Sequence, residues 1–136
     1  MNKWDALEYV LNDYHDKVPI EFWSDKDFVL NACHWNGFNF RFANNELKND
    51  KEFVFKVIKY WGYSFQYADD SLKIDKEFVI KAVSYSASVL KYTDLSLKID
   101  KEFILKVLKN YKPTLEYVED VLKDNITFMD KVKNQS

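Results

Sequence analysis

The stretch Asp75-Lys76-Glu77-Phe78-Val79 decides the fold, because versions of it return at a constant spacing along the chain. Each version begins 25 residues after the previous one, at residues 25, 50, 75 and 100. A related start at residue 125, Asn-Ile-Thr-Phe-Met, keeps the same phase. A Leu-Lys pair repeats in the second half of each period, beginning at residues 47, 72, 97 and 122. Self-similarity at a fixed period of this length is the signature of a repeat architecture.

Each repeat is predicted to contain two helices. The first begins at its aspartate, whose carboxylate accepts hydrogen bonds from the free amides of the first turn. Its apolar residues, Phe78 among them, cover well over half of the helix circumference, so neighbouring repeats must contact it from both sides. Gly37 and Gly62 fit the end of this helix, and Pro113 stops it in the fourth repeat. A shorter second helix follows and carries, in the second repeat, Phe65, Tyr67, Ala68 and Leu72.

We therefore predict an all-α fold, a helical-repeat solenoid of stacked two-helix units with a 25-residue period. We expect the 136 residues to form a single helical-repeat domain. Within it we expect an N-terminal capping unit at 1–24, repeats at 25–49, 50–74, 75–99 and 100–124, and a C-terminal capping helix at 125–136. At the last start, the positions held by Phe55 and Ile58 become Asp130 and Lys133. Such a change to polar residues is what a terminal cap needs for solubility.

Composition narrows the classes of function. Hydrophobic residues make up 47% of the chain and charged residues 31%, a balance typical of a globular protein. The net charge is -2 and Arg41 is the only arginine, so we do not expect nucleic acid to be the direct ligand. No signal peptide or long apolar stretch is visible, and Cys33 is the only cysteine. We expect a cytoplasmic protein without a membrane partner.

The motif D-K-E-F-V-x-K-x-V, followed by L-x-Y-x-x-x-x-L-K-x-D, covers roughly residues 20–133. It resembles a tandem repeat family catalogued as domain of unknown function 4116. The resemblance implies helical-repeat modules, often strung together in longer proteins, and no assigned catalytic residues. It thus favours an interaction role over a chemical one. The third repeat departs from the pattern, because Ala87 replaces the glycine of the turn.

Few residues are candidates for catalysis or metal binding. The histidines are His15 and His34, and Cys33 precedes the second of them. Adjacent residues on a helix point about 100° apart, so the pair is poorly placed to share a metal ion. We interpret it as a core cysteine beside a surface histidine. With two glycines in the chain, no phosphate-binding glycine motif can form. We expect no catalytic residues, cofactor or metal, and hence no enzyme.

Acidic residues recur near the end of the second helix of each repeat, where a stack would align them. They are Asp69, Asp70, Asp94, Glu119 and Asp120. One interpretation is a solvated face with helix-end capping. The other is a docking strip for a basic partner, or for a protein that normally grips nucleic acid. A strip of lysines on the first helices alternates with glutamate and is interpreted as a solvated face.

Aromatic residues offer a second candidate surface. Trp35, Tyr60 and Tyr85 share one repeat position on the flank of the apolar arc, and Tyr63 lies in the turn just beyond. Core packing explains most aromatic residues here, but a partly exposed aromatic rim is typical of binding hot spots. The chain therefore offers two alternative partner-binding surfaces, one aromatic and one acidic.

The function that fits these features is that of a non-enzymatic protein-binding module presenting a rigid helical-repeat surface. The alternative is a small acidic inhibitor or immunity protein that blocks a nucleic-acid-handling enzyme complex. Direct RNA binding through lysines and aromatic residues is disfavoured by the acidic charge and the single arginine. The partner's identity and the oligomeric state stay open.

Overall fold

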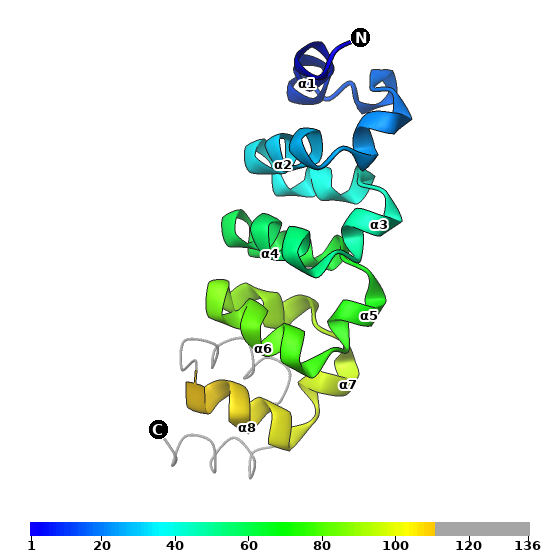
Figure 1. Ribbon diagram of the computed structural model, residues 1–136. Helices are drawn as coiled ribbons and strands as arrows, with labels where there is room; N and C mark the ends of the chain where they lie inside the picture. The colour runs from blue at the N-terminus through cyan, green and yellow to red at the C-terminus, as the bar shows by residue number, and fades with distance from the viewer. Residues whose placement is uncertain (111–136) are drawn as a thin grey trace. The chain divides into compact units, whose positions relative to one another are not determined.

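The computed structural model describes residues 1–110, and its regular elements there are α-helices and short 3-10 helices (Figure 1). The all-α repeat fold is thereby confirmed. The chain divides into two compact units, unit 1 (Met1–Asp69) and unit 2 (Asp70–Ser136). Pro113, Glu119, Asp120 and the expected C-terminal capping helix lie outside the described residues.

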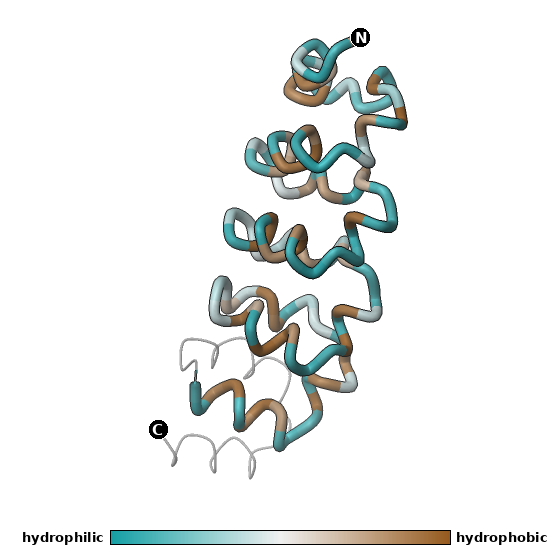
Figure 2. The backbone as a smooth tube through the Cα atoms, viewed as in Figure 1, coloured by the Kyte–Doolittle hydropathy of each residue, from teal (hydrophilic) through white to brown (hydrophobic). Residues whose placement is uncertain are grey.

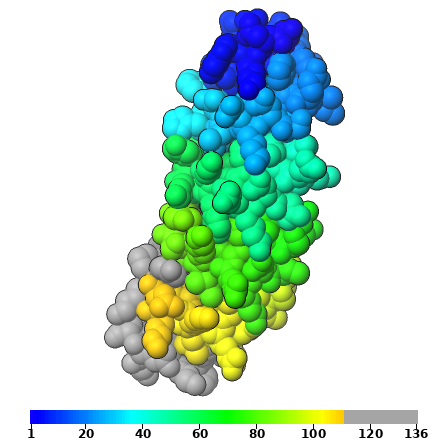
Figure 3. Space-filling view, in the orientation of Figure 1, coloured from blue at the N-terminus to red at the C-terminus, as the bar shows by residue number. Residues whose placement is uncertain are grey.

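Unit 1 is built from a leading helix and two helical repeats. Its elements are α1 (Lys3–Leu11), η1 (His15–Lys17), η2 (Ile20–Ser24), α2 (Lys26–Trp35), η3 (Gly37–Phe42), α3 (Asn45–Lys48), α4 (Lys51–Tyr60) and η4 (Gly62–Tyr67), where η marks a 3-10 helix. Helix α1 packs against α2, and α2 packs against α4. Figure 3 shows the corresponding residues as consecutive bands of colour from dark blue to green. Neighbours in sequence are therefore neighbours in the stack.

Unit 2 continues the same order of elements. They are α5 (Asp70–Lys73), α6 (Lys76–Tyr85), η5 (Ala87–Tyr92), α7 (Leu95–Lys98) and α8 (Lys101–Asn110). Helix α6 packs against η5 and α8. Polar and apolar residues alternate along α8 in Figure 2, as they do along α4 in unit 1. This is the pattern of a helix with one face in the core.

The core consists of the same positions in every repeat. The four phenylalanines that follow the helix-starting aspartates are each at most 4% exposed; they are Phe28, Phe53, Phe78 and Phe103. The next residue in each repeat is even more completely buried. The inward face predicted from the repeat is thus confirmed for the described repeats.

The long helices begin where the sequence predicts. In each, the Oδ1 atom of the aspartate accepts a hydrogen bond from the amide of the phenylalanine three residues later, as Asp50 does from Phe53 at 3.1 Å. In three of these aspartates the other carboxylate oxygen binds a lysine one step earlier in the stack, in the N-terminal capping segment or in the preceding repeat. The pairs are Lys3–Asp25 at 2.9 Å, Lys26–Asp50 at 3.0 Å and Lys76–Asp100 at 3.1 Å. One carboxylate therefore caps its own helix and joins two consecutive repeats.

The prediction of one continuous second helix is wrong. The structure has a 3-10 helix and a separate one-turn α-helix, divided by extended residues such as Ala43 and Asn44. At this break between the two short helices, a backbone amide donates a hydrogen bond to a carbonyl one step earlier in the stack, in the capping segment or in the preceding repeat. These bonds are Asn44 to Trp23 at 2.9 Å, Asp69 to Lys48 at 2.9 Å and Asp94 to Lys73 at 3.0 Å. A continuous α-helix would use these amides internally, so the break frees them to join consecutive repeats.

The turn after α2 is held by the next repeat. Gly37 follows the helix as predicted, but its backbone is not left-handed. A Cβ atom there would lie 2.4 Å from Ser64 Oγ and 2.6 Å from Trp61 Cβ. Ser64 Oγ donates to the carbonyl of Gly37 at 2.9 Å, and the indole of Trp61 donates to the carbonyl of His34 at 3.1 Å. Glycine is needed here for close approach between two repeats.

Candidate functional site

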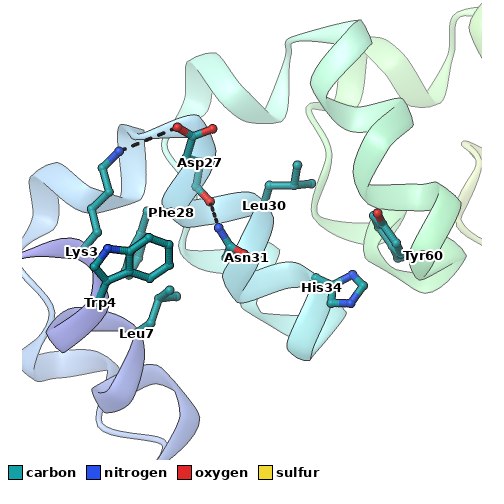
Figure 4. A pocket seen from close by; sticks show the side chains of 9 residues that line it. All are labelled: Lys3, Trp4, Leu7, Asp27, Phe28, Leu30, Asn31, His34 and Tyr60. Carbon is teal, nitrogen blue, oxygen red and sulfur yellow. Dashed lines mark hydrogen bonds and ion pairs between the residues drawn. The ribbon is translucent and has the colours of Figure 1, made fainter.

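A groove of about 400 Å³ crosses the three long helices of unit 1 (Figure 4). Helix α1 provides Lys3, Trp4 and Leu7; α2 provides Asp27, Phe28, Leu30, Asn31 and His34; α4 provides Tyr60. In Figure 4 the side chains of α1 face those of α2, and Tyr60 lies beyond His34 at the other end. We call this feature the Trp4–Tyr60 groove. Its volume lies within the usual range of ligand pockets, roughly 300–1,000 Å³.

Trp4 is directed outward by the way α1 is anchored. The Asn2 side chain caps the helix by accepting from the Asp5 amide at 2.9 Å. Ala6 and Val10 bury the inner face of α1. On the outer side Lys3 reaches the Asp25 carboxylate, and Trp4 remains 70% exposed. The indole therefore forms a wall of the groove instead of part of the core.

The other end of the groove is also aromatic. The rings of His34 and Tyr60 meet edge to face, with centroids 4.5 Å apart. The backbone at His34 is fixed by the hydrogen bond from Trp61. Tyr60 ends α4 and is 54% exposed. Between the two aromatic ends, Leu7 and Leu30 provide a half-buried apolar floor.

The polar groups of the groove are unevenly paired. Lys3 Nζ lies 2.9 Å from Asp25 but 3.9 Å from Asp27. The pKa of Lys3 is raised, first of all by its hydrogen bond to Asp25. The Asp27 side chain is 86% exposed, so its carboxylate stays in water at the groove rim. Asn31 Nδ2 donates to the Asp27 carbonyl at 2.8 Å, and its Oδ1 is an acceptor for a ligand.

The predicted aromatic residues fall into different places. Tyr60 lines the groove, and Trp35, 64% exposed, ends the same helix that forms its floor. Tyr85 is exposed at the end of α6 in unit 2. Tyr63 is half-buried, and its hydroxyl accepts a hydrogen bond from the Gly37 amide at 3.0 Å. Tyr63 therefore contributes to the contact between consecutive repeats.

The predicted acidic residues in the described part of the chain differ in their surroundings. Asp94 caps α7, because its Oδ2 accepts from the Ser96 amide at 3.0 Å and hydroxyl at 2.7 Å. These bonds lower the pKa of Asp94. Asp69 is half-buried and donates its amide to Lys48. Asp70 is fully exposed, 3.5 Å from Lys73. Helix capping thus accounts for Asp94, and Asn44 at the same repeat position caps α3 through the Leu47 amide.

The cysteine and histidine do not form a chemical pair. Cys33 is 1% exposed, and burial raises the pKa of its thiol to about 12. The thiol is therefore protonated at neutral pH, whereas the nucleophilic form is the thiolate. His34 faces solvent in the groove. The interpretation as a core cysteine beside a surface histidine is confirmed.

Sequence reasoning did not select Trp4, Asn31 or His34 as binding residues. A signal for Trp4 exists in two ion pairs within unit 1, one from the N-terminal capping segment to the first repeat and one from the first repeat to the second. Lys3 binds Asp25 as Lys26 binds Asp50, so Trp4 holds the place that Asp27 holds in the following repeat. An exposed tryptophan in place of a repeated acidic residue is a departure from the pattern that packing does not require.

Comparison with known proteins gives one family. The model of the family described as domain of unknown function (DUF4116) matches residues 16–48, 25–73 and 50–98, which together cover more than half of the chain. No curated protein and no solved structure matches the chain. Within the described residues, none of the helices has the length and apolar character needed to span a membrane. In the same part of the chain, no group of three or more His, Cys, Asp or Glu side chains is arranged to hold a metal ion.

Proposed function

The chain belongs to the DUF4116 family, and we propose that it is a non-enzymatic protein-binding module whose binding surface centres on the Trp4–Tyr60 groove. The observation that carries the proposal is the pair of exposed aromatic side chains at the two ends of an apolar groove. Trp and Tyr are the residue types most enriched among binding hot spots, which sit in pockets near the centre of an interface. Trp4 and Tyr60 have this setting.

A surface larger than the groove is available around it. A stable protein interface buries about 800 Å² on each partner. The groove supplies its centre, and the exposed Trp35 at the end of α2 extends the surface beyond it. Consecutive helices joined by ion pairs and backbone hydrogen bonds hold these side chains in fixed register. Such pre-organisation reduces the entropy lost on binding.

Charge favours a protein over a nucleic acid as the partner. Nucleic-acid affinity depends on lysine and arginine side chains that neutralise phosphates. Among the residues that line the groove, Lys3 is the only lysine or arginine, and its ammonium group is bound to Asp25. Asp27 would repel a phosphate at the same rim. The groove therefore has exposed aromatic rings but lacks the positive charge that binding of single-stranded nucleic acid requires.

The inhibitor alternative depends on carboxylates that are free to meet a basic surface. The Asp94 carboxylate is bonded to Ser96, whereas the Asp70 side chain is fully exposed, 3.5 Å from Lys73. Replacing Asp70 and Asp94 by Asn preserves capping and removes both charges. We expect this double variant to bind the partner as the parent chain does. A loss of binding would favour the acidic surface over the groove.

The proposal is tested by affinity capture of the tagged full chain from native cell extract, with and without nuclease. Mass spectrometry identifies the captured proteins, and the Trp4→Ala variant serves as the matched bait. We expect a protein partner that survives nuclease and is depleted in the Trp4→Ala capture. Capture that disappears with nuclease, or that is equal for both baits, would contradict the proposal.

A further inference from the structure

We propose that the Trp4–Tyr60 groove binds an extended, basic segment of the partner protein. An arginine or lysine of that segment lies between Trp4 and Asp27, and an apolar residue lies against Leu30 and Tyr60. The inference rests on the proposed function and adds to it the chemistry of the partner. It is carried by the charge of the groove and by the order of its side chains.

The charge at the α1 end of the groove is negative. Lys3 supplies one ammonium group to two carboxylates, and it lies 2.9 Å from Asp25 against 3.9 Å from Asp27. The better-solvated carboxylate, that of Asp27, is therefore only partly neutralised. A ligand cation would gain an attractive partner there without displacing Lys3. A ligand carboxylate would meet Asp27 with the nearest ammonium already engaged.

The indole of Trp4 favours the same cation. A lysine or arginine head group is attracted to the face of an aromatic ring within about 6 Å of its centre, and tryptophan is the strongest partner. Trp4 is 70% exposed and lines the same end of the groove as Lys3 and Asp27 (Figure 4). The methylene stem of the ligand side chain would cover Leu7, since long basic side chains bury their stems on apolar surface. Ring and carboxylate thus select one type of side chain.

The rest of the groove suits an extended backbone and an apolar side chain. Asn31 lies between the two ends and offers an amide oxygen to a backbone N–H. The groove runs across three consecutive helices, a span of about 16–20 Å if packed helix axes are 8–10 Å apart. An extended chain advances about 3.3 Å per residue, so roughly five or six residues cross it. An arginine near Trp4 and an apolar residue near Tyr60 are then about four or five positions apart.

The test is an NMR titration of the full ¹⁵N-labelled chain with capped pentapeptides. The probes are arginine-alanine-alanine-alanine-leucine and its reversed order, because either chain direction fits the groove. The control probes carry glutamate in place of arginine. We expect shifts at the Trp4 indole N–H, the Asn31 side-chain amide and the His34 backbone. For at least one direction, binding should be about 10-fold tighter with arginine than with glutamate, a ratio typical of exchanging attraction for repulsion at an exposed site.

Matched variants assign the effect to its residues. Asp27→Asn should weaken binding of the arginine probe by about 2–5-fold, the upper part of the range for one exposed ion pair. Glu77→Gln changes the same repeat position in unit 2 and should leave binding unchanged. Trp4→Ala should remove the shifts at Asn31. Equal affinity for the arginine and glutamate probes, or no shift up to about 10 mM probe, a concentration at which even weak binding is visible, would overturn the inference.

The outcomes separate this inference from the proposed function. If capture of the partner depends on Trp4 while the arginine and glutamate probes bind equally, the protein-binding role stands. The proposal that the partner's segment is basic is then wrong. If the arginine probe binds as expected but capture is equal for the parent chain and Trp4→Ala, the groove recognises cations and the proposed function fails.

Discussion

The aspartate that begins each long helix makes two separate contacts with its two carboxylate oxygens. In Asp50, Oδ1 accepts from the Phe53 amide, and Oδ2 lies 3.0 Å from Lys26 of the preceding repeat. The helix cap was predictable from sequence, because it is a local contact over three residues. The ion pair was not, because it depends on how two repeats stack. Both contacts lower the pKa of Asp50, and the hydrogen bond from the Phe53 amide has the larger effect.

Two substitutions at Asp50 separate the two contacts. Asn keeps an acceptor for the cap and loses the ion pair, whereas Ala loses both. We expect Asp50→Ala to be less stable than Asp50→Asn by roughly 1 kcal/mol, the usual value of a helix cap. Asp50→Asn should lie within about 1 kcal/mol of the parent chain, since the ion pair is partly exposed. Urea unfolding at neutral pH measures both differences.

Asp50 also makes the free energy of unfolding depend on pH. Because the folded pKa of Asp50 lies below the ordinary value for an aspartate, ionisation stabilises the folded state above that ordinary value. This contribution is lost as the pH falls through the folded pKa. The stability advantage of the parent chain over Asp50→Asn should therefore be constant near neutrality and shrink below about pH 4. An advantage that grows on acidification would contradict the ion pair.

The sign of the stability change caused by Gly37→Ala tests the close approach of two turns. Glycine to alanine at a compatible backbone position stabilises proteins by about 0.4–1 kcal/mol. At Gly37 the added Cβ would overlap Ser64 and Trp61, and overpacking costs about 1–3 kcal/mol. We expect Gly37→Ala to lower the free energy of unfolding, measured with urea. Ala87→Gly, the reverse change at the same repeat position, should cost about 0.5–1 kcal/mol for entropic reasons. A more stable Gly37→Ala would mean that the two turns do not approach closely.

At the scale of elements, the long helices were predictable and the second half of the repeat was not. Phe78 and its equivalents recur with an aspartate cap and helical spacing, so local pattern and burial agree. In the second half, Ala68 and Leu72 also have helical spacing, yet the chain is extended between η4 and α5. At the break a backbone amide forms a hydrogen bond with another repeat. A local pattern of apolar residues cannot predict that bond.

The break can be tested with proline. Asn44 has φ -69° and follows Ala43 with ψ 151°, so proline fits the backbone there. Asn44→Ala and Asn44→Pro both lose the side-chain cap of α3, but only proline also removes the amide bound to Trp23. We expect Asn44→Pro to be roughly 1–2 kcal/mol less stable than Asn44→Ala, because a carbonyl loses its donor. Equal stability in urea unfolding would show that the bond contributes nothing.

The inward face of the long helices is tested in α6. Phe78→Ala should lower the free energy of unfolding by roughly 3–5 kcal/mol, the range for truncating a buried phenylalanine. Tyr85→Ala, on the same helix but exposed, should cost less than about 1 kcal/mol. Chemical denaturation compares the two variants directly. A loss below about 1 kcal/mol at Phe78 would mean that the assignment of the buried face is wrong.

At the scale of the whole molecule, the repeat was predictable and the groove was not. The 25-residue period gave the all-α fold and the register of Trp35, Tyr60 and Tyr85. Trp4 lies in the leading unit, which does not keep that period. Lys3 and its partner Asp25 are 22 positions apart, whereas residues 26 and 50 of the next pair are 24 apart. The groove combines α1, which lies outside the 25-residue period, with α2 and α4, which follow it. A search for repeated positions therefore does not find the α1 side of the groove.

The central claim is that the chain binds a protein through unit 1, and quantitative capture from native extract tests it most directly. The baits are the parent chain, Tyr60→Ala in the groove and Tyr85→Ala at the same repeat position in unit 2, each treated with nuclease. Circular dichroism first confirms that the three baits are equally folded. We predict a partner whose recovery falls by about 10-fold or more with Tyr60→Ala, as for a hot-spot residue, and by less than about 2-fold with Tyr85→Ala. Equal recovery with all three baits, or a partner lost on nuclease treatment, would contradict the account.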